Sequence, residues 1–311
     1  MRRAFIVAIL TIAILSLDIG QTENKKPNQN NNYPIIDMHM HAYSIDEPGF
    51  SWRIPNPATG QPSAVTNSKE HLESTIAAMR QYNIVKAVVS VGFKNPEVVQ
   101  QWKTAAPDRI IASLSFDDPS TLDLSTVRKE FISRRRSVLG EVGAQYEGLP
   151  PDDPKLKPYF ALAEELDIPV GIHMGPGPPG ASYTCCPKYR ARLSNPLLLE
   201  EVLVNHPKLR IYIMHAGWPM LDELMSLMFS FPRVYVDLAA VNWIAPRKEF
   251  HTYLRRLVEA GFGKRLMFGS DQMFWPESIG MAIENINSAN FLTEEQKRDI
   301  FYNNAARFLR L

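Results

Sequence analysis

Short apolar runs alternate with longer amphipathic stretches along most of the chain. Eight runs are apolar at nearly every position, which predicts strands that are buried on both faces. Such strands are typical of a parallel sheet covered by helices, because a strand with one wet face would alternate apolar with polar residues. The predicted strands are 35–41, 84–91, 109–116, 137–142, 168–173, 209–215, 233–238 and 265–270.

The stretches between these strands carry signals of helix starts. Ser68 precedes the helical stretch 69–82, and three further starts pair a capping residue with proline. Those pairs are Asn95-Pro96, Asp153-Pro154 and Asn195-Pro196. Eight strand–helix units in about 250 residues predict an α/β fold, a single-domain (β/α)8 TIM barrel. A doubly wound open sheet is the alternative, but no Gly-x-Gly-x-x-Gly follows the first strand.

The N-terminal residues have a different pattern. Arg2 and Arg3 precede an apolar run from Ala4 to Leu17. A charged start followed by a short apolar run is typical of a secretory signal, and the run is shorter than the roughly 20 apolar residues of a transmembrane helix. No Ala-x-Ala cleavage site follows, so residues 1–20 are expected to be a signal peptide or an uncleaved N-terminal anchor. The protein is therefore expected to be secreted or periplasmic.

Composition and charge restrict the partners. The chain has 311 residues, a formal net charge of +1 and 45% hydrophobic residues. This balance gives no reason to expect nucleic acid as a partner, and a membrane is expected only through the N-terminal anchor. Residues 21–33 are rich in Asn, Gln and Lys and are expected to be a disordered polar linker before the barrel domain, 34–311. We expect a small-molecule partner, and the sequence leaves the oligomeric state open.

Candidate chemistry lies where the predicted strands end, because the active sites of such barrels are built there. In the first strand, Asp37-Met38-His39-Met40-His41, alternate side chains share a face, so the two imidazoles converge. The other strand-end residues of this kind are Glu141, His173, His215 and Asp271. Each one alone could be a hydrogen-bonded core residue. Together, six ligand-type side chains on one rim predict a metal site.

The remaining histidines lie elsewhere. His71 and His251 fall on predicted helices and are expected to be solvated. His206 precedes Pro207 in a turn that enters the sixth strand. It is therefore expected at the opposite rim, with a structural role.

These motifs resemble the amidohydrolase superfamily, and more narrowly its metal-dependent, amidohydrolase-related TIM-barrel branch. The resemblance covers about residues 34–311 and includes the Asp-Met-His-Met-His strand, Gly-Glu-Val-Gly around Glu141 and Gly-Ser-Asp at the eighth strand. It implies that His39, His41, His173 and Asp271 hold a metal, and that His215 binds a second metal or polarises the substrate. Glu141 bridges two ions in some members, whereas others bind one ion without such a carboxylate.

The residues predict water-activating chemistry. A divalent ion with an open coordination position lowers the pKa of bound water to about 7. Asp271 could accept the proton of that water, and His215 could stabilise the developing oxyanion. We therefore predict a metal-dependent hydrolase that cleaves an ester, lactone or amide bond of a small molecule. Zinc is the default ion, with manganese, iron and cobalt open, because nitrogen and oxygen sites rank these metals similarly.

Two other functions stay open at this point. The same superfamily scaffold is shared by decarboxylases and hydratases, so a lyase that uses its metal as a Lewis acid is the alternative. A secreted binding protein with a non-catalytic barrel is the third interpretation. The intact set of ligand residues argues against it, because binding alone would not require both the His-x-His pair and Asp271.

Two long loops are expected to shape the substrate site. The loop 43–67 contains Trp52 and several prolines, and its length is typical of a lid or binding loop. The loop 174–194 is basic, which suggests a carboxylated substrate, and a merely solvated loop is the alternative. Its candidate residues are Lys188, Arg190 and Arg192, and further candidate wall residues are Trp218 and Asn242.

The second loop also contains both cysteines of the chain, Cys185 and Cys186. Adjacent cysteines rarely bridge each other, and two cysteines alone build no disulfide framework. There is no Cys-x-x-Cys spacing for a zinc site. We therefore expect two free thiols in this loop.

Overall fold

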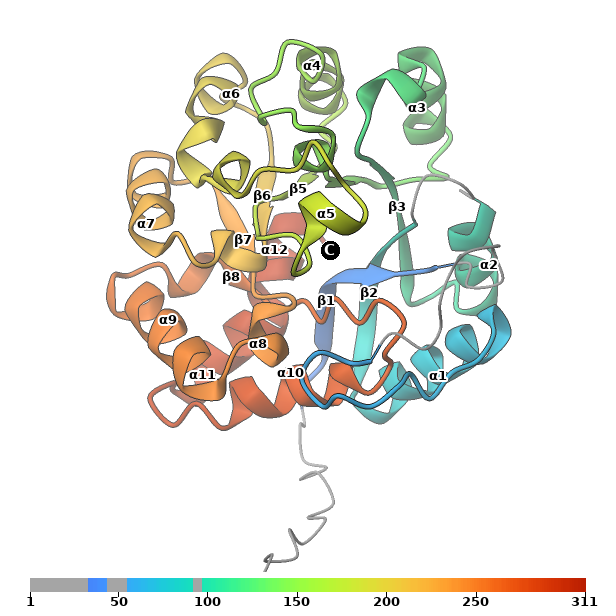
Figure 1. Cartoon of the computed structure of the whole chain (residues 1–311), viewed down its shortest axis with the longest axis vertical. Helices are drawn as coiled ribbons and strands as arrows, with labels where there is room; N and C mark the ends of the chain where they lie inside the picture. Colours follow the sequence, from blue (N-terminus) through green and yellow to red (C-terminus); the bar gives the residue numbers. More distant parts are fainter. Residues whose placement is uncertain (1–32, 44–54, 92–96) are drawn as a thin grey trace, which may run out of the picture.

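Eight parallel strands alternate with helices and form one sheet in the order β1 to β8 (Figure 1). The structure is a computed structural model that describes residues 33–43, 55–91 and 97–311. Its strands are β1 (Ile35–His41), β2 (Ile84–Ser90), β3 (Ile110–Phe116), β4 (Val138–Val142), β5 (Val170–His173), β6 (Ile211–Met214), β7 (Tyr235–Asp237) and β8 (Leu266–Met267). Each predicted strand is present, with ends that differ by a few residues.

Backbone hydrogen bonds close the sheet into a barrel. The Met38 N–H donates to the Phe268 carbonyl at 2.9 Å, and the Asp271 N–H donates to the His39 carbonyl at 2.7 Å. These bonds join the first strand to the segment that follows the eighth. The predicted (β/α)8 barrel is confirmed, and the open sheet is excluded.

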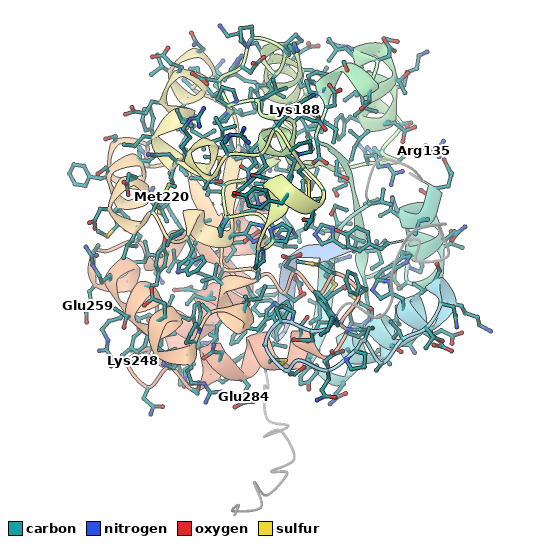
Figure 2. The ribbon with its side chains drawn as sticks, in the orientation of Figure 1. Arg135, Lys188, Met220, Lys248, Glu259 and Glu284 are labelled. Carbon is teal, nitrogen blue, oxygen red and sulfur yellow. A yellow bond between two sulfur atoms is a disulfide. The ribbon has the colours of Figure 1, made fainter. Side chains whose placement is uncertain are left out.

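Helices surround the barrel (Figure 1). They are α1 (Ser68–Gln81), α2 (Glu97–Ala105), α3 (Leu124–Ile132), α4 (Lys157–Glu165), α5 (Ala181–Thr184), α6 (Glu200–Asn205), α7 (Leu221–Ser230), α8 (Val241–Ile244), α9 (Arg247–Glu259), α10 (Ser278–Asn287), α11 (Glu294–Arg298) and α12 (Asn304–Leu309). Short turns of other helix types are η1 (Pro119–Thr121), η2 (Ala144–Glu147), η3 (Ala191–Ser194), η4 (Pro196–Leu199), η5 (His215–Gly217), η6 (Gly263–Arg265) and η7 (Asp299–Asn303). Charged side chains such as Arg135, Lys248 and Glu259 point away from the barrel (Figure 2).

Two capping signals lie at or beside an observed helix start, whereas α4 begins at Lys157 with Leu156 as its N-cap, three residues after the predicted cap Asp153. Asn67, one residue before the predicted cap, accepts a hydrogen bond from Glu70 N at the start of α1. Asn195 caps η4 in the same way, at 2.9 Å from Leu197 N. The predicted start at 95–96 lies outside the described residues.

Glycines in neighbouring strands make room for a large side chain inside the barrel. A Cβ on Gly171 of β5 would lie 2.5 Å from the ring of Tyr212 on β6, and one on Gly140 of β4 would lie 2.9 Å from the Gly171 carbonyl oxygen. Tyr212 is completely buried, and its hydroxyl donates to the Met38 carbonyl at 3.2 Å. Phe308 of α12 packs against the Tyr212 ring with 5.5 Å between centroids. This packing fills one end of the barrel, and the candidate functional residues lie at the other end.

Parts of the predicted organisation lie outside the described residues. They include the signal or anchor at 1–20, the linker up to residue 32, and Trp52 in the first long loop. Within the ranges that the structure does describe, no helix has the length and hydropathy needed to cross a membrane.

Candidate metal centre

The predicted rim residues meet at the carboxyl end of the barrel. His39 Nε2 lies 3.2 Å from His41 Nε2, because both side chains leave the same face of β1. Asp271 Oδ1 lies 3.0 Å from His41 Nε2 and 3.7 Å from His39 Nε2. On the other side, His215 Nε2 lies 3.2 Å from His173 Nδ1. All of these side chains are buried.

Glu141 lies between two sets of histidine nitrogens. Its Oε2 is 3.5 Å from His39 Nε2 and 3.4 Å from His41 Nε2. Its Oε1 contacts His173 Nδ1 and is 3.9 Å from His215 Nε2. The two oxygens of one carboxylate therefore face two different groups of ligands. The triads whose atoms lie close enough to hold an ion are His39, His41 and Asp271, and His39, Glu141 and His215.

Hydrogen-bond acceptors fix the tautomer of two histidines. His39 Nδ1 lies 3.2 Å from Asp237 Oδ2, and His215 Nδ1 lies 3.1 Å from the Ala239 carbonyl oxygen. A carboxylate or a carbonyl only accepts, so in its neutral form each imidazole carries its proton on Nδ1 and its lone pair on Nε2. Nε2 is the atom that faces the centre in both residues, as a metal ligand requires.

Asp237 at the end of β7 is the residue that sequence reasoning missed. Its Oδ1 accepts hydrogen bonds from His215 N at 2.8 Å and Ala239 N at 3.1 Å, while Oδ2 faces His39. One buried carboxylate thus positions two histidines of the centre. The signal was present, because Asp237 interrupts an apolar strand as the other strand-end residues do.

The residues present fit a divalent cation. Asp271 Oδ1 is buried without a hydrogen-bond partner although it faces two imidazoles. Among the ion pairs in the described part of the chain, no lysine or arginine neutralises Asp271, Glu141 or Asp237. Buried carboxylates and imidazole lone pairs that converge without a cationic side chain repel one another unless a cation joins them. Imidazole and carboxylate are also the donors that zinc, manganese, iron and cobalt accept.

Electrostatics favour the metal-binding forms of Asp271 and His173, whereas His39 has to lose a proton. Burial would raise the pKa of Asp271, but His39 and His41 outweigh it and lower that pKa to about 2. Asp271 is therefore ionised at neutral pH. Burial lowers the pKa of His173, and the neighbouring His215 lowers it further, which favours the neutral imidazole. Burial also opposes a proton on His39, but Asp271 and Asp237 raise its pKa, so an incoming cation displaces a proton there.

Aromatic and acidic side chains border the centre. Tyr43 stacks on His41 with 5.0 Å between ring centroids, and the Tyr146 hydroxyl lies 3.3 Å from His173 Nε2. Asp117 follows β3, and burial, with added repulsion from Glu141, raises its pKa to about 8. The tyrosines carry no sequence signal of their own, because only the folded loops bring them to the rim.

The three basic residues of the second loop are all exposed. Lys188 Nζ pairs with Glu147 Oε2 at 2.9 Å, and both are exposed. Arg190 donates to backbone oxygens of its own loop, and Arg192 is exposed. In the described part of the chain, none of the three forms an ion pair with a rim residue. Their role in binding a carboxylate stays a prediction.

The two predicted wall residues differ in position. Asn242 is completely buried, and its amide donates to the Gly269 carbonyl at 2.8 Å, so it supports the backbone leading to Asp271. Trp218 is half-buried directly after η5, which begins at His215. Trp218 therefore stays a candidate wall residue, whereas Asn242 lies behind the site.

The expectation that His71 is solvated was wrong. It lies on the inward face of α1 with Thr75 and Met79, at helical spacing, and is fully buried. His251 is half-buried, with Nε2 at 2.9 Å from the Asn285 carbonyl oxygen, so it is not fully solvated either. His206 contacts Glu164 Oε2 at 3.1 Å before β6, as expected of a structural histidine.

His71 anchors the turn that carries Asp271. Its Nε2 lies 3.3 Å from Gln272 Oε1, and the Gln272 amide donates to the His41 carbonyl at 2.7 Å. Asp271 and Met273, on either side of Gln272, have φ values of 48° and 46°, which side chains other than glycine adopt at a cost. The buried glutamine thus holds a strained turn against β1.

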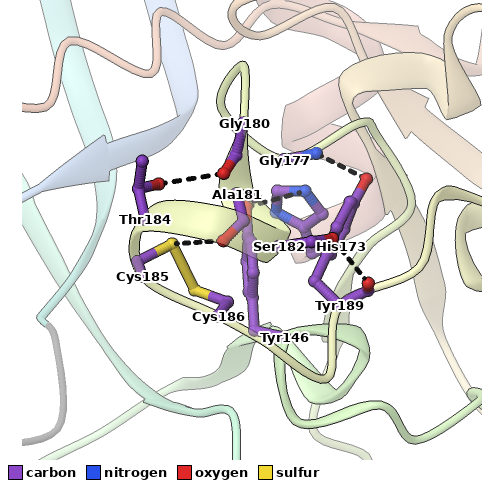
Figure 3. The surroundings of a disulfide bond; sticks show 10 residues. All are labelled: Tyr146, His173, Gly177, Gly180, Ala181, Ser182, Thr184, Cys185, Cys186 and Tyr189. Atoms are coloured by element: carbon purple, nitrogen blue, oxygen red, sulfur yellow. Dashed lines mark hydrogen bonds between the residues drawn. A yellow bond between two sulfur atoms is a disulfide. The ribbon is translucent and has the colours of Figure 1, made fainter.

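The prediction of two free thiols was also wrong. Cys185 and Cys186 form a disulfide with each other at the end of α5 (Figure 3). Both backbone N–H groups donate to the Ala181 carbonyl, at 3.2 Å and 2.9 Å. The turn at the end of α5 therefore brings the two side chains to the same side of the chain.

The fold and the site together define a (β/α)8 barrel with a histidine–carboxylate centre at the carboxyl end of its strands. The family model described as amidohydrolase matches residues 36–311. The chain belongs to the amidohydrolase family, and the resemblance inferred from its motifs is confirmed.

Solved structures share the fold at low sequence identity. An uncharacterized TIM-barrel protein from Bordetella bronchiseptica has a TM-score of 0.67 and 19% identity, over 89% of this chain and 98% of that one. A 5-carboxyvanillate decarboxylase from Novosphingobium aromaticivorans, complexed with manganese and a nitrobenzoic acid, has a TM-score of 0.61 and 15% identity, over 92% and 98% of the chains. A probable 2-pyrone-4,6-dicarboxylic acid hydrolase from Acinetobacter baumannii has a TM-score of 0.58 and 15% identity, over 89% and 99%.

Among curated proteins, the protein fluG of Emericella nidulans is 24% identical over 133 residues. The match covers 38% of this chain and 15% of fluG. The chain thus matches only a small part of that longer relative.

Proposed function

We propose that the protein is a metal-dependent hydrolase that cleaves an ester, lactone or amide bond of a small molecule. The observation that carries this proposal is the position of Glu141, whose Oε2 faces His39 and His41 while Oε1 faces His173 and His215. A carboxylate in that position suits a pair of ions, and paired ions are a recurrent device for hydrolysis.

Asp271 is the proposed proton carrier. When bound, a divalent ion held by His39, His41 and Asp271 would supply Lewis acidity and lower the pKa of a water molecule. Asp271 is ionised at pH 7, and its Oδ1 faces the histidines, so Oδ2 is the oxygen that accepts a proton and later delivers it to the leaving group. The Gln272 contacts hold this carboxylate in place.

His215 has one of two roles, set by the number of ions. Burial opposes a proton on His215, but Glu141 outweighs it and raises its pKa. With one ion, a protonated Nε2 would donate to the developing oxyanion. With two ions, Nε2 would be a ligand; in both cases Nδ1 keeps its proton and donates it in a hydrogen bond to the Ala239 carbonyl.

A decarboxylase or hydratase is the second candidate. One observation favours it: the fold is similar to that of a decarboxylase complexed with manganese. Decarboxylation also needs no second ion, so this reaction does not depend on a bridging Glu141. We propose zinc as the first ion to test, with manganese, iron and cobalt beside it. Secretion or export to the periplasm through residues 1–20 remains part of the proposal.

The test is a substrate screen with the ions supplied separately. Esters, lactones and amides, with and without a carboxylate, are compared with carboxylated aromatic acids, and products are analysed by mass spectrometry in ¹⁸O-labelled water. Hydrolysis places one labelled oxygen in the product and is lost in Asp271→Asn but kept in Asp222→Asn, an exposed control. Release of carbon dioxide with no labelled oxygen in the remaining product would support the lyase instead.

A further inference from the structure

The disulfide lies in a segment that touches the candidate metal centre. In the view of Figure 1, α5 crosses in front of the barrel opening. A Cβ on Gly175, at the start of this loop, would lie 2.8 Å from His215 Cβ, so the loop backbone rests on the rim. Cys185 is exposed and Cys186 is half-buried. Cys185 is therefore accessible to small reagents although the loop packs on the site.

Hydrogen bonds connect the disulfide to Tyr189. The Tyr189 N–H donates to the Cys186 carbonyl at 2.9 Å, and the Tyr189 carbonyl accepts from Ser182 Oγ at 2.9 Å. The Tyr189 hydroxyl accepts from Gly177 N at 2.7 Å (Figure 3). Tyr189 is buried by these contacts, in a loop whose neighbouring residues are exposed. The turn closed by the disulfide thus fixes where Tyr189 lies.

Tyr189 in turn places a side chain that contacts a candidate ligand. Its ring stacks on Tyr146 with 5.6 Å between centroids and 29° between planes. The Tyr146 hydroxyl lies 3.3 Å from His173 Nε2, and their rings are 5.1 Å apart (Figure 3). A continuous set of contacts therefore runs from the disulfide through two tyrosines to His173.

We propose that Cys185 and Cys186 form a reversible redox site whose reaction partner is a dithiol reductant. Two electrons and two protons pass from the dithiol to the pair, which gives two cysteine thiols and the partner's disulfide. Exposure of Cys185 gives the attacking thiolate access to its sulfur. The ring that joins the two adjacent residues opens, and their side chains then rotate independently.

Reduction loosens the loop around Tyr189. In the oxidised chain, the two N–H groups that share the Ala181 carbonyl and the covalent link hold this turn together. Without the link, Tyr189 is held by noncovalent contacts alone, which are its hydrogen bonds with Ser182, Gly177 and Cys186 and its stacking on Tyr146. Local opening of the loop becomes more frequent, and the support for Tyr146 on His173 weakens.

The loop contains its own reporter of this change. Lys188, Arg190 and Arg192 are exposed trypsin sites on the segment that the disulfide restrains. The full chain is oxidised, or reduced with a phosphine, which becomes the phosphine oxide as water supplies the two protons. Cleavage at these three bonds is then timed by mass spectrometry. The readout needs no substrate, so its result is independent of the proposed hydrolase activity.

The matched control is the double variant Cys185→Ser/Cys186→Ser. We expect the oxidised wild type to resist alkylation by iodoacetamide and the reduced form to take up two labels. We expect loop cleavage about tenfold faster after reduction, and equally fast with or without phosphine in the double variant. If the double variant does not fold, reduction and reoxidation of the wild type alone decide the matter. Alkylation without reductant, or equal cleavage in both redox states, would overturn the proposal.

Discussion

The substitution Asp237→Asn tests how the fold selects the binding nitrogen of His39. The two N–H groups of His215 and Ala239 need an acceptor, so the asparagine oxygen must take the place of Oδ1. Its NH₂ group then faces His39 Nδ1, where the carboxylate lay at 3.2 Å. Two donors cannot face each other, so His39 moves its proton to Nε2 and loses the lone pair that faces the centre.

The size of the effect follows from the contact that is lost. A buried hydrogen bond to a charged group contributes about 1.5–3 kcal/mol. Loss of a partner that orients a metal-binding histidine weakens metal affinity roughly 10–100-fold, which agrees with that range. We therefore expect Asp237→Asn to bind metal roughly 10–100-fold more weakly than the wild type. Competition with a chromogenic chelator measures it on the purified chain.

A surface carboxylate provides the control. Asp222 pairs with Arg256 at 2.7 Å on the exposed side of α7, so Asp222→Asn should leave metal affinity unchanged. Circular dichroism of both variants checks that the barrel is intact. Wild-type affinity in a folded Asp237→Asn chain would refute the tautomer argument.

Three further predictions concern stability and are read from urea unfolding. Burial lowers the pKa of His71 to about 4, below its unfolded value of 6.5, so the free energy of unfolding falls by up to about 3 kcal/mol as pH drops from 6.5 to 4. The variant His71→Phe should lose this pH dependence, and an unchanged pH dependence in the variant would contradict the prediction. Gln272→Ala should cost about 1–3 kcal/mol, because the buried His71 N–H and His41 carbonyl lose their partner; Gln296→Ala, at an exposed cap, is the comparison. Gly171→Ala should cost about 1–3 kcal/mol because its Cβ meets the Tyr212 ring, and a neutral result would show that the barrel interior has room.

The barrel and its rim could be predicted because both depend on local pattern. Apolar runs mark strands that are buried on both faces, and the place where each run ends decides which side chains reach the rim. His39, His41, Glu141, His173 and the other predicted ligands therefore meet as expected. Asp237 also lies where an apolar run ends, so the same rule could have predicted that it reaches the rim.

Other features depend on contacts that a linear reading does not contain. The burial of His71 follows from helical spacing with Thr75 and Met79, but its partner Gln272 is 201 residues away. The disulfide depends on a turn at the end of α5 that no spacing rule predicts. Lys188 forms an ion pair with Glu147, a residue of another loop, and the linear sequence does not indicate this partner.

Metal content per chain decides whether Glu141 joins two ions. We would measure it by elemental analysis after reconstitution, for the wild type and for Glu141→Gln. We expect two ions in the wild type and one in the variant, because the Glu141 carboxylate faces both ligand groups. One ion in both proteins would remove the bridging role of Glu141 and make decarboxylation as well supported as hydrolysis. A chain that binds no ion would contradict the account.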